Sequence, residues 1–240
     1  MKIISIIGSG TMGTGIAQLF ASNDWSVNLI DNNSKALENS QSNLKKIINR
    51  MQEKGRLNSK GLKKILSNIN WSTDITNIKD SSIVIEAVIE QLLVKQKIFL
   101  DIESHVSSDC IIATNTSSLS VAEIASNISY PHRIMGLHFF NPVPLMKLVE
   151  LIPLKNTDST LIKNIKNILG QFGKQVVTTQ DSPGFIVNRI ARPFYGEALK
   201  IYELEIANFA TIDWAMKNYG KFKMGPFELM DYIGNDINYY

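Results

Sequence analysis

A histidine and a glutamate twelve positions apart are the side chains that the sequence places best for acid–base chemistry. His138 and Glu150 lie in apolar runs on either side of a segment that contains Pro142 and Pro144. Two buried strands joined by a turn are the simplest interpretation, and a hairpin centred on Pro144 would bring the imidazole opposite the carboxylate. An imidazole oriented in this way is a general base. A plain core histidine is the alternative, but it would leave Glu150 buried without a partner.

A glycine-rich turn near the amino terminus is the second motif with a chemical meaning. The run GSGTMG at residues 8–13 fits the pattern G-x-G-x-x-G, and it follows an apolar run at residues 2–7 and opens a helical pattern. Glycines permit a tight turn there, and the backbone then comes close to a pyrophosphate at the amino terminus of the helix. This context favours dinucleotide binding over a plain glycine turn. The expected contacts are Gly8, Gly10, Thr11, Met12 and Gly13.

Asp31 indicates which dinucleotide binds. It ends the next apolar run, at residues 26–30, and lies 18 positions after Gly13. A carboxylate at this point accepts a hydrogen bond from a ribose 2′-hydroxyl and repels a 2′-phosphate. Asn32 and Asn33 stand where an NADP site would favour arginine. NAD is therefore the predicted cofactor.

Strand and helix patterns alternate over the first 180 residues or so, which predicts an α/β fold with a parallel, doubly wound sheet of Rossmann type. Besides the hairpin, the expected strands are residues 2–7, 26–30, 83–88, 110–114 and 174–179. The expected helices are one beginning near residue 12 and then 33–53, 59–67, 91–106, one beginning near 121, and 158–172.

A capping signal fixes one loop of this sheet. Ser120 and Glu123 form an S-x-x-E capping box flanked by a hydrophobic staple of Leu119 and Ile124, so a helix should begin at Val121. Residues 115–117 are then left in the loop that follows a strand. Open α/β sheets bind their ligands at this end of the strands.

The sequence from Asp181 onward predicts a smaller, all-helical second domain. Ser182 can cap a helix with Pro183 in its first position, and Pro193 should kink or interrupt that helix. We therefore expect domains at residues 1–181 and 182–240. A last helix starts at Gly225 and meets no stop signal, which suggests that the second domain is incomplete.

Composition excludes several classes of protein. With 240 residues, 44% hydrophobic and 20% charged, the chain is ordinary globular material. The apolar start MKIISIIG is too short for a signal peptide or a membrane span, so a cytoplasmic protein without a membrane partner is expected. Cys110 is the single cysteine, which excludes an intrachain disulfide and the usual cysteine metal clusters, and no metal site is predicted.

Positive charge is concentrated in one segment. Between Lys35 and Lys64 nine basic residues face two acidic ones, a local balance of 9 − 2 = +7 against +3 for the whole chain. One such segment favours a single anionic ligand over a nucleic-acid surface. A solvated helix face is the alternative.

Five motifs, in this order and spacing, resemble the 3-hydroxyacyl-CoA dehydrogenases that act on short substrates, including bacterial 3-hydroxybutyryl-CoA dehydrogenases. They are GSGTMG, NTSSL, HFFNPVPLMKLVE, DSPGFIVNR and MGPFELMDYIG. The resemblance covers essentially the whole chain and implies NAD-dependent oxidation of an (S)-3-hydroxyacyl-CoA to the 3-oxoacyl-CoA, a step of fatty-acid β-oxidation. It also implies a homodimer through the second domain and further helices beyond MGPFELMDYIG.

The resemblance implies a role for each motif residue. His138 would be the general base and Glu150 its orienting partner, while Ser117 and Asn188 would hydrogen-bond the substrate. The residues implied to lie at the cofactor, with Glu90 and Lys95 at the nicotinamide ribose, are Ala87, Glu90, Lys95, Asn115 and Asn141. The basic segment would contact coenzyme A through Asn43 and Arg50.

Two other functions stay open at this point. One is a non-catalytic family member that binds a dinucleotide or acyl-CoA, although such a role needs no base. The other is a hydroxy-acid dehydrogenase on the same two-domain plan, which would carry a catalytic lysine where this chain has Asn188. The sequence leaves the length of the acyl chain open, as well as the choice between a simple fatty chain and a dicarboxylate.

Overall fold

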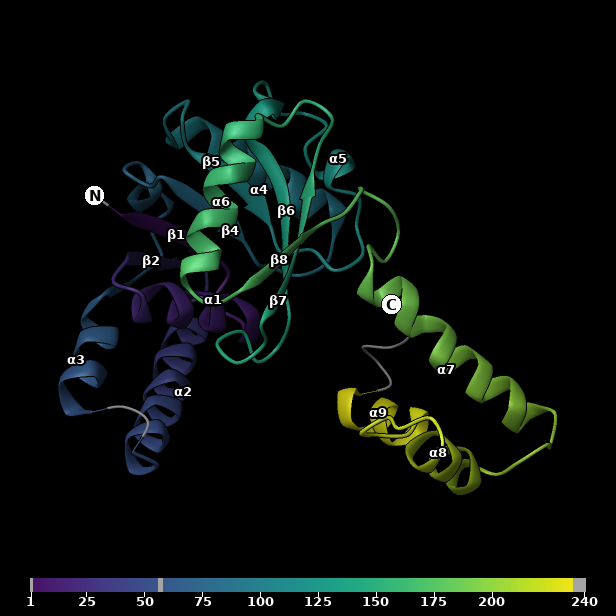
Figure 1. The fold of residues 1–240 in the computed structure, drawn as a ribbon. Coiled ribbons are helices and arrows are strands. Elements are labelled where there is room, and N and C mark those ends of the chain that lie inside the picture. The colour runs from purple at the N-terminus through teal and green to yellow at the C-terminus, as the bar shows by residue number, and fades with distance from the viewer. Residues whose placement is uncertain (1, 56–57, 235–240) are drawn as a thin grey trace. The chain divides into compact units, whose positions relative to one another are not determined.

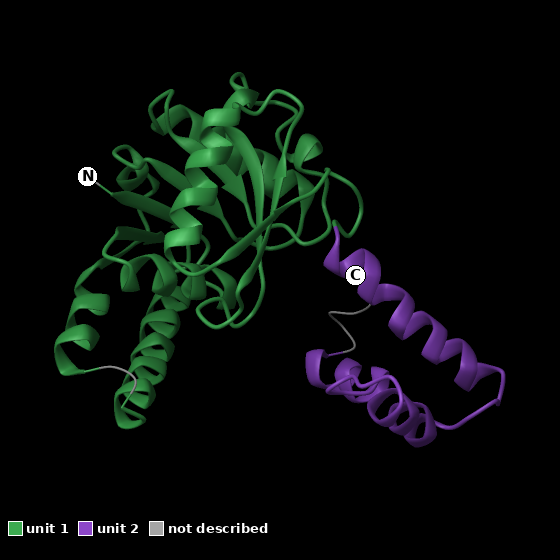
Figure 2. Cartoon of the chain, viewed as in Figure 1, with its two compact units in different colours: residues 1–185 green, residues 186–240 purple. Residues whose placement is uncertain are grey.

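The computed structural model describes residues 2–55 and 58–234, which form two compact units. Unit 1 is residues 1–185 and unit 2 is residues 186–240 (Figure 2). The division falls after Phe185 rather than after Asp181. Both residues are held by unit 1: the Asp181 carboxylate accepts hydrogen bonds from the backbone N–H groups of Val121 and Ala122, and Phe185 packs in the core.

Unit 1 is built on one sheet, in which the described residues form eight strands in the order β3-β2-β1-β4-β5-β6-β7-β8 (Figure 1). The strands are β1 (Ile3–Ile7), β2 (Ser26–Ile30), β3 (Ile69–Ser72), β4 (Ile83–Glu86), β5 (Ile111–Thr114), β6 (Ile134–Phe139), β7 (Leu148–Pro153) and β8 (Gln175–Thr178). Neighbouring strands from β3 to β6 are parallel, β6 and β7 are antiparallel, and β7 and β8 are parallel again. The predicted doubly wound sheet is therefore confirmed, and its antiparallel pair is the predicted hairpin, in which the chain reverses between β6 and β7.

Helices cover both faces of this sheet, as a doubly wound fold requires (Figure 1). One face carries α1 (Thr11–Ser22), α2 (Ser34–Glu53), α3 (Ser59–Ser67) and α6 (Ser159–Gln171). The other carries α4 (Leu92–His105), α5 (Val121–Ile124) and the short 3₁₀ turn Ile75–Ile78; a second such turn is Pro131–Arg133. The start of α5 at Val121 confirms the predicted helix start, and Ser120 Oγ accepts from the Glu123 N–H as its cap.

The alternation of side chains along each strand decides which residues face α4 and α5. In β4, Ile83 and Ile85 pack with α1 in one core, whereas Val84 belongs to the core under α4. Glu86 has the same parity as Val84 and lies on the α4 face. By the same rule His138 shares its face with Ile134, and Glu150 shares its face with Ile152. The α4 face is thus the polar one at the ends of the central strands.

The single cysteine behaves as a core residue. Cys110 is 1% exposed and packs in the core under α4. Burial raises the pKa of its thiol to about 12, so the thiol is inert at neutral pH.

Unit 2 consists, among its described residues, of α7 (Val187–Glu203), α8 (Phe209–Asn218) and α9 (Pro226–Ile233). The predicted start of α7 at Pro183 is wrong. The N–H of Phe185 donates to the carbonyl of Ser182, and Gly184 and Phe185 have φ of 74° and 46°, a conformation that no right-handed helix contains. These residues form a turn, and the helix begins after it.

Two further predictions for unit 2 need correction. The α7 helix continues through Pro193, so of the predicted kink or interruption the interruption is wrong and the kink stays a prediction. The last helix does have a stop signal: α9 ends at Ile233, and Gly234 follows with a φ of 99° that favours glycine. Residues 235–240 lie outside the described residues.

Candidate active site

The predicted hairpin places the imidazole and the carboxylate opposite each other. His138 of β6 pairs with Glu150 of β7, and the distance from His138 Nδ1 to Glu150 Oε2 is 2.7 Å. Glu150 is fully buried and His138 is 6% exposed. An ionised carboxylate only accepts hydrogen bonds, so a neutral His138 that faces an ionised Glu150 would carry its proton on Nδ1 and keep a lone pair on Nε2.

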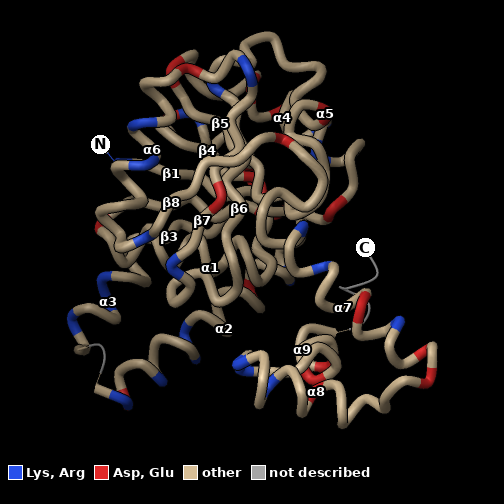
Figure 3. The backbone as a smooth tube through the Cα atoms, turned by 45° about the vertical axis from the view of Figure 1, so that its right-hand side comes forward, with Lys and Arg blue, Asp and Glu red and all other residues tan. Residues whose placement is uncertain are grey.

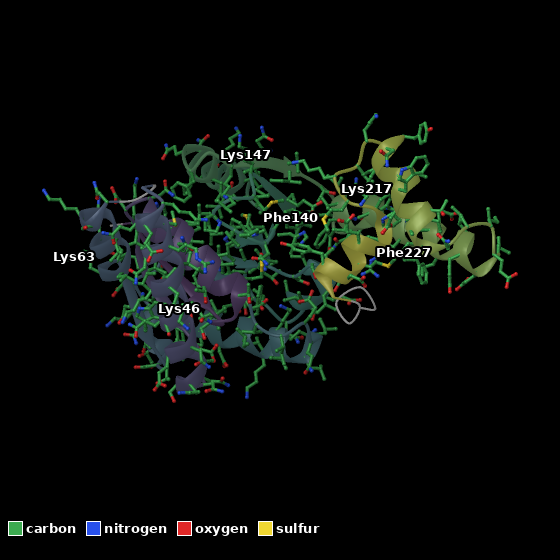
Figure 4. All side chains as sticks on the ribbon, turned by 90° about the horizontal axis from the view of Figure 1, so that it is seen from below. Lys46, Lys63, Phe140, Lys147, Lys217 and Phe227 are labelled. Atoms are coloured by element: carbon green, nitrogen blue, oxygen red, sulfur yellow. The ribbon has the colours of Figure 1, made fainter. Side chains whose placement is uncertain are left out.

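Two aromatic rings flank the imidazole. The ring centroid of Phe140 lies 4.4 Å from that of His138, and the ring centroid of Phe185 lies 5.8 Å from it. Phe140, which is labelled in Figure 4, directly follows the end of β6. Apolar rings of this kind exclude water and strengthen the hydrogen bond between His138 and Glu150.

The loop after β5 lies beside this pair. The side-chain oxygen of Asn115 accepts from the N–H of Phe139 at 2.9 Å, which ties the loop to the residue next to His138. The N–H groups of Ser117 and Ser118 both donate to Glu90 Oε1, at 2.9 and 3.2 Å. Asn115 is therefore tied to the residue next to His138, and Ser117 is tied to Glu90, whereas their roles at the substrate and cofactor stay predictions.

Glu90 in turn is bound to a buried lysine. Lys95 Nζ lies 3.1 Å from Glu90 Oε2 and 2.6 Å from Glu86 Oε1, and the Lys95 side chain is 1% exposed. Burial by itself would raise the pKa of the Glu90 carboxyl, but the Lys95 charge and the hydrogen bonds from Thr116 and Ser117 outweigh it and hold that pKa below its usual value. In the structure the Lys95 ammonium thus contacts carboxylates, and its predicted contact with a ribose stays a prediction.

The lowered pKa of Glu90 predicts that the free energy of unfolding depends on pH. A carboxyl with a lowered pKa stabilises the fold above its ordinary value of 4.5, and that contribution is lost as the pH falls through the lowered value. The gap in unfolding free energy between wild type and Glu90→Gln should be constant at neutral pH and shrink below 4.5. Urea unfolding at a series of pH values measures this gap. A gap that widens on acidification would contradict the ion pair.

The glycine turn has the geometry that a dinucleotide needs. A Cβ on Gly13 would lie 1.9 Å from the Gly8 carbonyl oxygen, and one on Gly8, whose φ is +104°, would lie 2.5 Å from the Ala87 carbonyl oxygen. Only glycine fits at these two positions. A Cβ built on Gly10 would meet no atom within 4 Å, so this side of its backbone is open to a ligand at the amino terminus of α1.

Asp31 makes hydrogen bonds to Ser9 of this turn. Its Oδ2 accepts from the N–H and the hydroxyl of Ser9, both at 2.8 Å, and its Oδ1 accepts from the N–H of Asn33 at 3.0 Å. These bonds fix the carboxylate at the end of β2 and leave it capacity for a further donor. The residues present therefore fit an NAD cofactor.

A cavity of about 1050 Å³ opens beside the glycine turn. Gly10 and Thr11 line it from α1, the loop of residues 141–145 lines it from the hairpin, and one face of α2 forms the rest. The lining residues of α2 include Asn43, Lys46, Ile47 and Arg50, and Lys54 adds to them directly after the helix ends. The structure thus brings the predicted coenzyme A contacts Asn43 and Arg50 to the same cavity as Gly10, Thr11 and Asn141.

The positive charge of the basic segment lies on α2 and α3 (Figure 3). Lys46 and Lys63 mark this side of unit 1 (Figure 4). Arg56, one of the nine basic residues, lies outside the described residues.

A buried lysine that the sequence did not single out makes hydrogen bonds to the loop that lines the cavity. Lys174 Nζ donates to the carbonyls of Val143 and Met146, at 2.5 and 2.6 Å, and the residue is 7% exposed. Burial lowers the pKa of Lys174. Its two bonds fix the loop that carries Asn141. A lysine just after a helix end gives no signal of this in the sequence.

Other residues of the site were also missed. Thr114 Oγ1 donates to Glu86 Oε2, and the hydroxyl of Thr116 donates to Glu90. Asp181 Oδ2 accepts from Ser120 Oγ at 2.8 Å and so joins the end of unit 1 to the start of α5. Glu86 was recognisable only as a carboxylate at a strand end.

The remaining predicted residues lie as follows. Met12 packs against the core with α1, and Ala87 follows β4 directly. Asn188 is in the first turn of α7, in unit 2, and its part in the site stays a prediction.

In the described part of the chain no group of three His, Cys, Asp or Glu residues could hold a metal ion. None of the described helices combines the length and apolar character needed to cross a membrane.

Comparison with known proteins identifies close relatives. The chain is 39% identical to the 3-hydroxybutyryl-CoA dehydrogenase of Clostridioides difficile, over 98% of this chain and 83% of that protein. It is 38% identical to the 3-hydroxyadipyl-CoA dehydrogenase of Escherichia coli, over 100% of this chain but only 50% of that protein. The crystal structure of (S)-3-hydroxybutyryl-CoA dehydrogenase from Ralstonia eutropha matches with a TM-score of 0.95 at 37% identity, over 98% of this chain and 83% of that one.

Family models cover both units. The model of the 3-hydroxyacyl-CoA dehydrogenase NAD binding domain matches residues 3–182, and that of the C-terminal domain of the same enzymes matches residues 184–240. The predicted α/β fold with a helical second region, the enzyme class and the NAD cofactor are confirmed. The chain belongs to the 3-hydroxyacyl-CoA dehydrogenase family.

Proposed function

We propose that the protein oxidises an (S)-3-hydroxyacyl-CoA to the 3-oxoacyl-CoA with His138 as the general base. The observation that carries this proposal is the 2.7 Å bond between His138 Nδ1 and the buried Glu150 carboxylate. A protein that only binds a dinucleotide or acyl-CoA needs no such base. The adjoining loop supplies Ser117 as a hydrogen-bond donor to the substrate, and Asn188 of unit 2 is the second proposed donor.

The proton chemistry follows from the geometry of the pair. His138 Nε2 takes the proton of the 3-hydroxyl while the C3–H bond breaks and a C=O bond forms. Bound NAD supplies the acceptor for the hydride that leaves C3. Glu150 stabilises the imidazolium that results and keeps Nδ1 protonated throughout. In the reverse direction the imidazolium donates its proton to the ketone oxygen.

Turnover of a 3-oxoacyl-CoA tests the proposal directly. Consumption of NADH should be seen with acetoacetyl-CoA and with a longer 3-oxoacyl-CoA, and the ratio of the two kcat/KM values reports the preferred acyl length. Binding of NADH without any turnover would support the non-catalytic alternative instead.

Asp31 is the proposed determinant of the preference for NAD over NADP. Asp31→Asn should weaken NADH binding by about 10- to 100-fold, the cost of losing a hydrogen bond to a charged group. It should also reduce the ratio of the NADPH dissociation constant to the NADH dissociation constant. Titrations of protein fluorescence with both nucleotides measure this. Asp74→Asn, at an exposed carboxylate, is the matched control. An unchanged ratio of the two dissociation constants would contradict the role of Asp31.

The cavity beside α2 is the proposed site for the coenzyme A portion of the substrate. Asn43, Lys46, Arg50 and Lys54 line it from one helical face, and their cations match phosphate groups. The same cavity reaches the glycine turn, so substrate and cofactor would lie side by side.

Charge reversal in this cavity should act on the substrate alone. The double variant Arg50→Glu/Lys54→Glu should raise KM for acetoacetyl-CoA by about tenfold or more, since two attractive charges become repulsive, and should leave NADH affinity unchanged. Lys60→Glu/Lys63→Glu on α3 makes the same change of charge away from the cavity and is the matched control. Equal effects of the two double variants would favour a solvated helix face.

Unit 2 is the proposed dimer contact. Its helices expose large apolar side chains, among them Ile190, Trp214 and Tyr232 at 71%, 53% and 80%. Surfaces of this kind are rarely left open to water. Sedimentation of the purified protein tests the homodimer.

Two further points are left open. The acyl group of the substrate is either a simple fatty chain or a dicarboxylate, and the cytoplasmic location stays a prediction.

A further inference from the structure

A carboxylate without a predicted function lies at the centre of the site's hydrogen bonds. Glu86, the last residue of β4, is fully buried and faces α4. Its Oε1 accepts from Lys95 Nζ at 2.6 Å and from the N–H of Val88 at 2.7 Å, and its Oε2 accepts from Thr114 Oγ1 at 2.7 Å. Three donors on one buried carboxylate, one of them charged, satisfy it without water.

Two routes lead from this carboxylate to the turn that carries Ser117. On the first, Lys95 connects Glu86 to Glu90, whose Oε1 accepts from the Ser117 N–H. On the second, Thr114 Oγ1 donates to Glu86 and accepts from the N–H of Thr116 at 3.1 Å. Both routes end on the backbone of residues 116–118.

A third bond leads to the cofactor side. The Val88 N–H on Glu86 fixes the turn just after β4, and Ala87 within that turn donates its N–H to the carbonyl of Ile7 at 2.8 Å. The Ala87 carbonyl oxygen is also the atom that leaves no room for a Cβ on Gly8. Glu86 therefore contacts both the turn beside the glycine motif and the network behind Ser117.

We propose that Glu86 is a positioning residue, which holds the cofactor-side turn after β4 and the substrate-side turn after β5 in a fixed relation. The inference rests on the proposed dehydrogenase function, because it assumes that a nicotinamide and a 3-hydroxyacyl group meet between these turns. Glu86 itself is fully buried and touches neither. It acts through Lys95, Glu90 and Thr114.

A purely structural buried bond offers the contrast. Just before β4 begins, Ser81 Oγ lies 2.6 Å from Ser5 Oγ of β1, and both residues are buried. Ser81→Ala removes a buried hydrogen bond from the same sheet without reaching either turn. It should cost stability and leave kcat, and its dependence on pH, unchanged.

The test compares Glu86→Gln with Ser81→Ala in the 240-residue chain. Glu86→Gln should lower kcat for acetoacetyl-CoA reduction by about 10- to 100-fold, the size expected when reacting groups are misplaced by about an ångström. KM for acetoacetyl-CoA should change little. Amide hydrogen exchange should speed up at residues 115–119 in Glu86→Gln and stay as in wild type in Ser81→Ala. This second measurement does not depend on turnover.

A double-variant cycle tests the route through Lys95. If Glu86 acts through Glu90, then Glu86→Gln/Glu90→Gln should lose little more activity than the worse single variant, whereas independent effects would multiply. Should Glu86→Gln not fold, the isosteric Thr114→Val takes its place with the same expectations.

Three outcomes would overturn the proposal. They are a kcat of Glu86→Gln within twofold of wild type, losses of activity in Glu86→Gln and Glu90→Gln that multiply in the double variant, and unchanged hydrogen exchange at residues 115–119. An inactive wild type would overturn the dehydrogenase function instead, and the exchange result would still decide the role of Glu86.

Discussion

Replacing His138 by glutamine is expected to lower kcat for acetoacetyl-CoA reduction by about 100- to 10,000-fold, the usual contribution of a general acid–base. Glutamine retains a hydrogen-bonding group at the end of β6 but has no site that accepts and returns a proton. NADH affinity should stay unchanged, because the glycine turn and Asp31 lie on other strands. Steady-state kinetics give the first quantity and fluorescence titration the second.

The matched control is His132→Gln, the same substitution at an exposed histidine. It should leave both quantities at their wild-type values. A His138→Gln variant with more than about a tenth of wild-type kcat would remove the histidine from the chemistry, since even weak acid–base catalysis exceeds that factor. A loss of NADH binding together with turnover would point to a folding defect, which the unfolding temperature would reveal.

The central pair was predictable because a hairpin is local. Once two apolar runs flank a proline-containing turn, the residues equally distant from its centre must pair, and His138 faces Glu150 in the observed register. The glycine turn was predictable for a similar reason, since strand, turn and helix follow one another within about 30 residues.

The missed features depend on contacts between distant segments. The strand β3 has only four residues, of which Ile69 alone is buried, so its pattern carries no periodic signal. The start of α7 was misplaced because Ser182 and Pro183 suit a helix amino terminus, whereas packing of Phe185 beside His138 requires a turn there. At this position the packing of Phe185 outweighs the local preference of Ser182 and Pro183 for a helix start.

The network around Glu86 shows the same limit within the site. A glutamate at a strand end and a lysine nine positions later give no sign that they pair, because the pairing depends on how α4 lies on the sheet. Thr114 adds its hydroxyl from a different strand. A network of this kind is assembled by the parallel sheet, which collects the carboxyl ends of separate strands at one edge.

Replacing Glu150 by glutamine should give the second-largest loss of activity. The change removes the charge that stabilises the imidazolium but keeps the shape of the side chain. It also offers Nδ1 either an amide oxygen or an amide N–H, and the second choice would place the proton on Nε2, the wrong nitrogen for a base. The corresponding change in a serine-protease triad costs about 10⁴-fold in kcat. For Glu150→Gln we expect a loss of between about 10² and 10⁴, at unchanged NADH affinity.

The coupling between the two residues gives the sharper measurement. Because Glu150 is proposed to act only through His138, Glu150→Gln should cost little further activity in a His138→Gln background. Glu38→Gln is the control at an exposed carboxylate, with a side chain that is 67% exposed, and should leave kcat unaltered. If Glu150→Gln kept full kcat, the buried carboxylate would serve packing alone. If its effect instead multiplied with that of His138→Gln, Glu150 would act on the substrate or cofactor by a route of its own, and the oriented base would no longer explain the site.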